Sequence, residues 1–187
     1  MHEEQPWREI ARYGRKAVAS GLTSSRFGNI SIAVDDSIFI TCTGSMLDEL
    51  DESQIVRVDL AGPCPMDETA SSETCVHRAV YQRSTHRAVI HTHSPYAVAM
   101  SILETEQVIP LDSEGLIFLG AVPVVQGRLG SEELGGAVSS ALVGHQACIA
   151  RSHGVFAAGK SLTEAYTAAC MVEHSAQVGY LVKAYRQ

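Results

Sequence analysis

The sequence predicts an α/β protein in which an antiparallel or mixed sheet is covered by helices, and two observations lead to this prediction. The strand patterns arrive mostly as hairpins, and the helical patterns fall between them as separate layers, unlike a regular βαβ succession. The length of 187 residues and the hydrophobic fraction of 45% indicate one globular domain over residues 1–187. A chain of this size buries about 70% of the surface that it exposes when unfolded.

The first elements are a helix and a hairpin. Residues 6–20 have the periodicity of an amphipathic helix, with Pro6 in the first turn and Gly21 as the C-terminal cap. Residues 29–34 and 37–41 are rich in apolar β-formers and are separated by two aspartates. Such a pair of segments predicts a β-hairpin.

The middle of the chain alternates short strands with helices. A strand is expected at residues 55–59 and a helix from Ser72 to about Gln82. The apolar run at residues 87–90 predicts a buried strand, because it is short and continuous. A further helix opens near Pro95, since proline is favoured in the first turn of a helix.

The last part of the chain is expected to contain two strands and two helices. A strand is predicted around residues 117–125, a helix from Glu132 to about Val143, and a strand over the apolar run at 146–150. A long helix follows from about Leu162 to Ala184. The four residues Ser161-Leu162-Thr163-Glu164 match the capping-box pattern at its start.

Charge and composition exclude several classes of function. A net charge of −7 argues against a nucleic-acid partner and against an anionic membrane surface. No apolar stretch approaches the roughly 18 residues of a membrane span, and the polar, acidic N-terminus is unlike a signal peptide. The five cysteines lack any C-x-x-C pair and are expected to be reduced, mostly buried thiols of a cytoplasmic protein.

A candidate metal site follows from His91-Thr92-His93, at the end of the predicted strand. Side chains at positions i and i+2 of a strand point to the same face, so the two imidazoles would project together. His153 follows another apolar run and is a third candidate. Three histidines with an open fourth position are typical of catalytic zinc. The alternative is a chance H-x-H sequence or a hydrogen-bonded pair.

Candidate anion-binding groups lie at turns and at a helix start. Ser71-Ser72-Glu73 begins a predicted helix, where free N–H groups and the helix dipole favour an anion. Ordinary N-capping would explain the same serines. The turns at Gly28-Asn29 and Thr43-Gly44-Ser45 offer uncharged donors and close backbone approach, although each is also a common turn signal.

Residues 154–161 fit the pattern G-x-x-x-x-G-K-S of a nucleotide-binding loop. This interpretation is rejected, because the segment after Ser161 is nearly all one helix and leaves no later strand to carry an acidic Mg²⁺ ligand. The Val-Phe-Ala-Ala insert also has the character of a strand.

The ordered set of motifs resembles the class II aldolase/adducin family, most closely its L-fuculose-phosphate aldolase branch. The matching motifs are Gly28-Asn29-Ile30-Ser31, Thr43-Gly44-Ser45, Ser71-Ser72-Glu73, His91-Thr92-His93-Ser94, His153-Gly154 and Gly159-Lys160-Ser161-Leu162 with Glu164-Ala165. They run from residue 28 to residue 165 in family order. The resemblance therefore covers most of the chain.

The resemblance implies a three-layer αβα sandwich around a mainly antiparallel sheet, assembled as a homotetramer with its sites at subunit contacts. It implies one Zn²⁺ per subunit, or another divalent metal, on His91, His93 and His153, with Glu73 as alternating ligand and catalytic base. Six residues would bind the phosphate of a phosphorylated sugar substrate: Gly28, Asn29, Thr43, Gly44, Ser71 and Ser72. The implied reaction cleaves or forms a ketose 1-phosphate, such as L-fuculose 1-phosphate, through dihydroxyacetone phosphate and an aldehyde.

The sequence departs from the family pattern at the proton donor. The family's fuculose enzyme carries a tyrosine in the loop after the strand that corresponds to residues 121–125, and this chain has none in that stretch. A second family tyrosine lies in a longer C-terminal tail. The donor on the aldehyde side is therefore unassigned.

Three alternative functions share the resemblance. A methylthioribulose-1-phosphate dehydratase would eliminate water on the same metal site, but the segment Met46-Leu47-Asp48-Glu49 lacks the lysine-rich run of that group. A pentose-phosphate 4-epimerase is the second alternative, although its chains are usually longer. An adducin-like binding module is the non-enzymatic alternative, and the presence of all the metal-site residues disfavours it.

Overall fold

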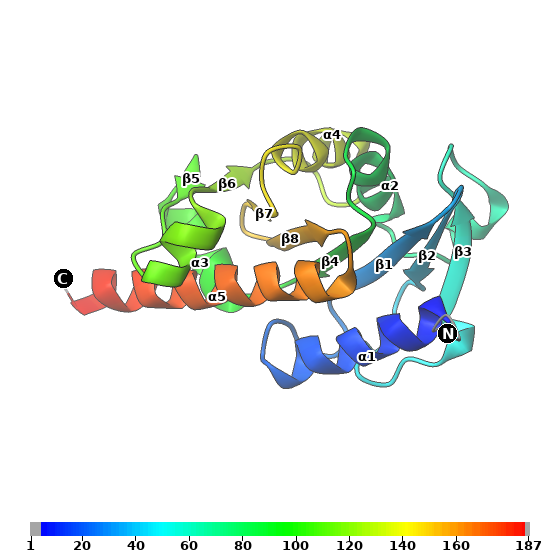
Figure 1. The fold of residues 1–187 in the computed structure, drawn as a ribbon, viewed down its shortest axis with the longest axis horizontal. Coiled ribbons are helices and arrows are strands. Elements are labelled where there is room, and N and C mark those ends of the chain that lie inside the picture. The colour runs from blue at the N-terminus through cyan, green and yellow to red at the C-terminus, as the bar shows by residue number, and fades with distance from the viewer. Residues whose placement is uncertain (1–4, 186–187) are drawn as a thin grey trace.

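The computed structural model describes residues 5–185, and eight strands of this region form one sheet (Figure 1). The sheet order is β3-β2-β1-β4-β8-β7-β6-β5. The strands are β1 (Asn29–Val34), β2 (Ser37–Thr41), β3 (Ile55–Asp59), β4 (Ala88–Thr92), β5 (Gln107–Val108), β6 (Val122–Val125), β7 (Ala147–Ala150) and β8 (Gly154–Gly159). All neighbouring strands are antiparallel except β6 and β7, which confirms the expected mainly antiparallel sheet.

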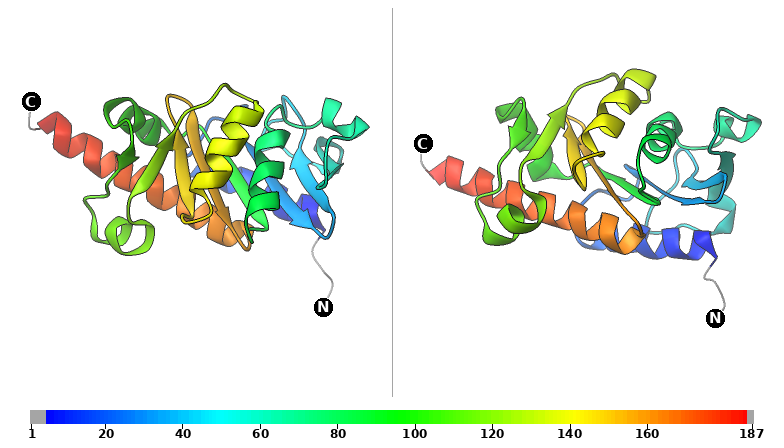
Figure 2. Two further views of the ribbon diagram at one scale, coloured as in Figure 1. Left: turned by 90° about the horizontal axis from the view of Figure 1, so that it is seen from above. Right: turned by 45° about the horizontal axis from the view of Figure 1, so that its top comes forward.

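Helices cover both faces of the sheet. The α-helices are α1 (Pro6–Ala19), α2 (Thr74–Arg83), α3 (Pro95–Leu103), α4 (Glu132–Ala141) and α5 (Leu162–Tyr185). Short helical turns are η1 (Glu52–Gln54), η2 (Pro65–Glu68) and η3 (Gly115–Leu119). In Figure 1, α2 and α4 lie above the sheet and α1 and α5 below it. Figure 2 shows α5, in orange and red, crossing the face opposite α4. The three-layer αβα arrangement is confirmed.

Alternate residues of β4 enter the two cores of the sandwich. Val89 packs in the core beneath α2 and α4, whereas Ala88 and Ile90 pack in the core that includes α1 and the start of α5. Because side chains alternate along a strand, His91 faces the same side as Val89. The strand therefore directs His91 toward α2.

Two glycines bring the neighbouring backbones close to the end of β4. Gly28 has a φ of +93°, and an added Cβ would collide with the carbonyl oxygen of His91. An added Cβ on Gly154 would collide with the carbonyl oxygen of Thr92. A larger residue at either position would push β1 or β8 away from β4, so both glycines are required by close approach.

Most predicted elements are confirmed within a few residues, but the segment 117–125 is a correction. Its strand is confined to Val122–Val125, and Gly115–Leu119 forms a π-helical turn whose three central apolar side chains are more than half exposed. Gly120 ends the turn with a φ of +63°. An apolar run does not by itself distinguish a strand from a short helix. The two-residue strand β5 had no sequence signal.

Other expectations are refined by the structure. Helix α2 begins at Thr74, so Glu73 is its N-cap residue, not a residue of its first turn. Residues Gly154–Gly159 form strand β8, which excludes a phosphate-binding loop there. All five cysteines are free, but only Cys148 is fully buried. Among the described residues, no helix has the length and apolar character needed to cross a bilayer.

Candidate metal centre

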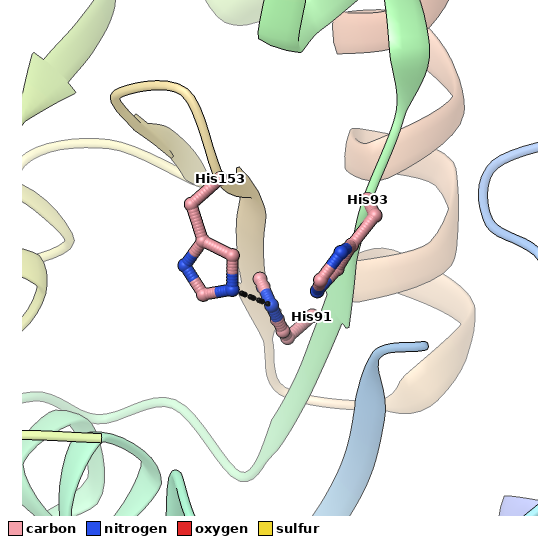
Figure 3. A group of neighbouring side chains, drawn as sticks. All are labelled: His91, His93 and His153. Carbon is pink, nitrogen blue, oxygen red and sulfur yellow. Dashed lines mark hydrogen bonds between the residues drawn. The ribbon is translucent and has the colours of Figure 1, made fainter. Parts of the chain in front are cut away.

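Three histidines meet where β4 and β8 lie side by side. His91 belongs to β4, His93 follows its end, and His153 lies in the turn between β7 and β8. Because Thr92 pairs with Val155 across the two strands, the turn before β8 is brought next to the end of β4. One nitrogen from each ring lies within 4.8 Å of the other two. Figure 3 shows the three imidazoles pointing toward one another.

The orientation of His91 is fixed by its backbone and aromatic neighbours. Its Nδ1 lies 2.9 Å from the carbonyl oxygen of Val155, and a carbonyl can only accept, so Nδ1 carries the proton. The ring stacks on Phe156, with the centroids 4.1 Å apart. The lone pair is therefore on Nε2, which points into the cluster. A hydrogen bond from the second ring nitrogen commonly holds metal-binding histidines in this way.

Glu73 supplies a carboxylate to the same cluster from the N-terminal end of α2. Its Oε2 lies 3.2 Å from His91 Nε2, and its Oε1 lies 3.8 Å from His153 Nε2. The Asn29 Nδ2 donates to Oε2 at 3.1 Å. Burial raises the pKa of Glu73, and the bond from Asn29 opposes this shift. A carboxyl group with a raised pKa is suited to exchange protons.

Burial keeps the three imidazoles neutral near pH 7. It lowers the pKa of His91 well below the ordinary value, and nearby His153 and His93 lower it further. Burial also lowers the pKa of His93, and it brings the pKa of His153 to about 4 together with the neighbouring His93. Neutral imidazole is the form that binds a metal ion.

The set of potential ligand atoms fits a divalent cation. Glu73 Oε1 is buried without a hydrogen-bond partner, and the Nε2 lone pair of His91 faces both the Glu73 carboxylate and His153 Nε2, each at 3.2 Å. Converging buried acceptors repel each other unless positive charge lies among them. Three imidazole nitrogens and one carboxylate oxygen match zinc well, because zinc binds nitrogen and oxygen ligands in tetrahedral sites.

The predicted phosphate-binding residues border one cavity of about 280 Å³ beside the histidines. Those residues are Gly28, Asn29, Thr43, Gly44, Ser71 and Ser72, and Glu73, His93 and His153 line the same cavity. The turn at residues 43–45 is held against the turn at 71–73 by two backbone bonds. Thr43 N donates to Thr69 O at 3.0 Å, and Ser71 N donates to Thr41 O at 3.0 Å. The structure thus brings every predicted site residue together.

Several residues near the cavity were missed by the sequence analysis. Arg26, Phe27 and Leu129 line its mouth, and Phe27 stacks on His93 with a centroid distance of 5.4 Å. Single residues in turns carry no pattern that would have identified them. His77 and Tyr81 lie behind the cavity and follow Glu73 at intervals of four residues. That spacing places both residues on the same helix face as Glu73, so the sequence could have identified them as its neighbours.

The buried histidines predict a loss of stability on acidification when metal has been removed by a chelator. The pKa values of His77 and His153 fall to about 3 and about 4 in the folded protein, below the ordinary value of about 6.5. Between about pH 6.5 and 4, only the unfolded chain binds these protons. The contribution of these two histidines to the free energy of unfolding is therefore fully present above about pH 6.5. It falls as the pH decreases, by up to about 1.4 kcal/mol per pH unit for each group.

Urea unfolding from pH 8 to pH 4.5 in the presence of chelator measures this dependence. The raised pKa of Glu73 acts in the opposite direction above its ordinary value, which reduces the slope. His153→Gln should have a shallower slope than the unchanged protein, whereas His145→Gln, in a loop outside the cavity, should not. Equal slopes in all three proteins would contradict the prediction.

The comparisons with known proteins agree with this geometry. Residues 8–180 match the family model described as the class II aldolase and adducin N-terminal domain. An L-fuculose phosphate aldolase of Methanococcus vannielii is 35% identical over 176 residues, covering 92% of each chain. A 3-oxo-tetronate 4-phosphate decarboxylase of Pectobacterium atrosepticum is 31% identical, covering 87% of this chain and 78% of the relative.

Among solved structures, the L-fuculose-1-phosphate aldolase of Thermus thermophilus superposes with a TM-score of 0.90. It is 35% identical in sequence, and the match covers 96% of this chain and 95% of that one. Family model, sequence identity and backbone similarity thus extend over nearly the whole chain, including both turns of the cavity and all three histidines. The chain belongs to the class II aldolase and adducin family.

Proposed function

We propose that this protein is a zinc-dependent aldolase that cleaves and forms a ketose 1-phosphate through dihydroxyacetone phosphate and an aldehyde, with L-fuculose 1-phosphate as the leading substrate. One observation carries the proposal. Three neutral imidazoles and a buried carboxylate border the same cavity as two turns that present uncharged hydrogen-bond donors. The similarity to the two L-fuculose phosphate aldolases supports the choice of substrate.

His91, His93 and His153 would hold the metal, and Glu73 would serve beside it as an alternating ligand and base. When bound, zinc supplies a Lewis acid that polarises the carbonyl of the substrate and stabilises negative charge after C3–C4 cleavage. The protein needs such a group because, among the described residues 5–185, no lysine lines the cavity to form a Schiff base.

The cavity turns at residues 28–29, 43–44 and 71–72 would bind the phosphate group. Ser71 and Ser72 lie immediately before α2, where the positive end of the helix dipole favours an anion. Gly44, with a φ of +75° and open space around its Cα, allows a ligand to approach the backbone closely. Arg26 at the cavity mouth would add a positive charge that offsets the acidic protein.

Glu73 would move the proton on the dihydroxyacetone phosphate fragment. In the synthetic direction it removes a proton from C3, and the resulting carbon nucleophile forms the C3–C4 bond with the aldehyde. In cleavage the same carboxylic acid returns the proton to C3 after the bond breaks.

We further infer that the protein is a single-domain cytoplasmic enzyme that assembles as a homotetramer with its sites at subunit contacts. Leu116, Ile117 and Phe118 expose 54%, 73% and 63% of their surface, and such a patch favours association. Sedimentation equilibrium measures the assembly directly. A monomer at micromolar concentration would contradict this part of the proposal.

A substrate panel tests the reaction. Zinc-loaded protein is incubated separately with L-fuculose 1-phosphate, ribulose 1-phosphate, methylthioribulose 1-phosphate and 3-oxo-tetronate 4-phosphate. Release of dihydroxyacetone phosphate, followed by its enzymatic reduction with NADH, is the expected result for the first substrate and, more slowly, for the second. Carbon dioxide and a dehydrated diketone are assayed in parallel.

Each of the other outcomes would indicate a function different from the proposed aldolase. Carbon dioxide from 3-oxo-tetronate 4-phosphate without triose phosphate would indicate a decarboxylase, as in the Pectobacterium relative. A diketone from methylthioribulose 1-phosphate would indicate a dehydratase. Protein that binds no zinc and turns over none of the four compounds would favour an adducin-like binding module.

A further inference from the structure

A network of buried polar side chains leads away from Glu73 between α2 and the sheet. Glu73, His77 and Tyr81 occupy positions i, i+4 and i+8, so they share the face of α2 that packs on β1. On β1, Asn29 and Ser31 point toward this face, since alternate strand residues face the same side. His77 and Ser31 are completely buried. Water does not compete for these hydrogen bonds.

The five side chains alternate between helix and strand. Asn29 Nδ2 lies 3.1 Å from Glu73 Oε2, and Asn29 Oδ1 lies 2.6 Å from His77 Nε2. His77 Nδ1 lies 2.6 Å from Ser31 Oγ, which lies 2.6 Å from Tyr81 Oη. Tyr81 Oη also lies 3.0 Å from the carbonyl oxygen of Ser31.

The proton positions in this chain follow from donor and acceptor rules. A carboxylate only accepts, so the amide nitrogen of Asn29 faces Glu73 and its oxygen faces His77. That oxygen also only accepts, so His77 Nε2 carries the proton. Burial lowers the pKa of His77 to about 3, so the ring is neutral and Nδ1 is an acceptor.

The same rules assign the hydroxyl protons of Ser31 and Tyr81 at the far end of the network. Ser31 must donate to His77 Nδ1, since Nδ1 has no proton. The 2.6 Å contact between Ser31 Oγ and Tyr81 Oη then needs the proton of Tyr81, which Ser31 Oγ shares with the Ser31 carbonyl oxygen at 3.0 Å. Every donor has an acceptor, and the whole network has a single direction, toward Glu73. Reversing Asn29 would place its oxygen against the carboxylate and would require the opposite tautomer of His77.

We propose that His77 is a positioning residue: held by Ser31 in the Nε2–H tautomer, it fixes the Asn29 amide so that Glu73 Oε2 remains an acceptor and Oε1 exchanges the substrate proton. Oε1 is the carboxylate oxygen that has no hydrogen-bond partner in the structure. The proposal rests on the proposed function only for the identity of that proton transfer. It also restricts Asn29, which has one Nδ2 hydrogen left for a phosphate group.

The tautomer of His77 is measured without substrate. In protein labelled with ¹⁵N-histidine, the ring nitrogen shifts of His77 are expected to be those of the neutral Nε2–H form from pH 5 to pH 9. In Ser31→Ala the donor to Nδ1 is absent, so a mixture of tautomers is expected. An Nδ1–H ring in the unchanged protein would overturn the proposed direction of the network.

The effect on the site is measured by zinc affinity and by kinetics. Loss of a partner that orients a ligand costs about 10–100-fold in affinity or activity. Ser31→Ala is therefore expected to weaken zinc binding, measured by competition with a chromophoric chelator, and to lower kcat by at least tenfold with KM changed less than threefold. The separate variant His77→Gln still offers a donor to Asn29 and an acceptor to Ser31. It should therefore retain most of the zinc affinity and most of kcat.

Ser139→Ala is the matched control. Ser139 is as buried as Ser31 but lies on α4, where its hydroxyl donates to Gly136 O. Equal losses in Ser31→Ala and Ser139→Ala, or unchanged zinc affinity and kcat in Ser31→Ala, would overturn the positioning role. If the unchanged protein turns over no substrate, the proposed function fails, and the tautomer and zinc measurements still decide on His77.

Discussion

Replacing His93 by alanine is expected to remove the metal and to lower turnover by at least about a thousandfold, because the reaction then has no Lewis acid. His93 is the appropriate ligand to test. It is partly exposed at the cavity, whereas His91 is completely buried and stacks on Phe156. Removing His91 would also disrupt the core. His93→Ala should therefore fold as the unchanged protein does.

The measurement is zinc content by atomic emission after dialysis, together with thermal unfolding and turnover. The unchanged protein should hold about one zinc per chain, in keeping with one three-histidine cluster among the described residues. His145→Ala, outside the cavity, should hold the same amount. Full zinc occupancy in His93→Ala would show that the metal is bound elsewhere.

Replacing Glu73 by glutamine is expected to lower kcat by about 10²–10⁴-fold, the usual contribution of a general base. The two side chains have nearly the same shape, and the glutamine oxygen can still accept from Asn29 Nδ2, as Oε2 does in the structure. The three imidazoles remain, so zinc is retained with reduced affinity. The loss should thus appear in proton transfer and not in folding.

A half-reaction isolates this step. Incubating dihydroxyacetone phosphate with the zinc-loaded protein in D₂O, without aldehyde, should exchange a C3 hydrogen for deuterium, which NMR detects. Glu73→Gln should slow the exchange as much as it slows the complete reaction, whereas Ser72→Ala should mainly weaken substrate binding. Unimpaired exchange in Glu73→Gln would assign the base to another residue.

The metal cluster could be predicted from sequence because its geometry follows from local rules. His91 and His93 share one face by strand alternation, and His153 was placed by the apolar run before it. Their meeting depends on β8 pairing with β4, which spacing cannot establish. Here the order of motifs in the family resemblance supplied the information that the residues alone lacked.

The π-helical turn at Gly115–Leu119 shows where local patterns fail. Its exposed apolar residues have the composition of a strand, and only tertiary contacts distinguish the two. An added Cβ at Gly115 would collide with side chains of Pro110 and Ser175, the latter on α5. A contact with a helix so distant in the sequence cannot be recognised from the residues around Gly115.

The position of β4 between β1 and β8 has a consequence for biosynthesis. His91 and His93 leave the ribosome well before His153, and β8 is the last strand of the sheet to emerge. A nascent chain that stops before this strand has no Val155 carbonyl to orient His91. Capture of the proposed metal ion would thus be a late event, coupled to completion of the sheet. Unfinished chains should therefore bind no metal at this site.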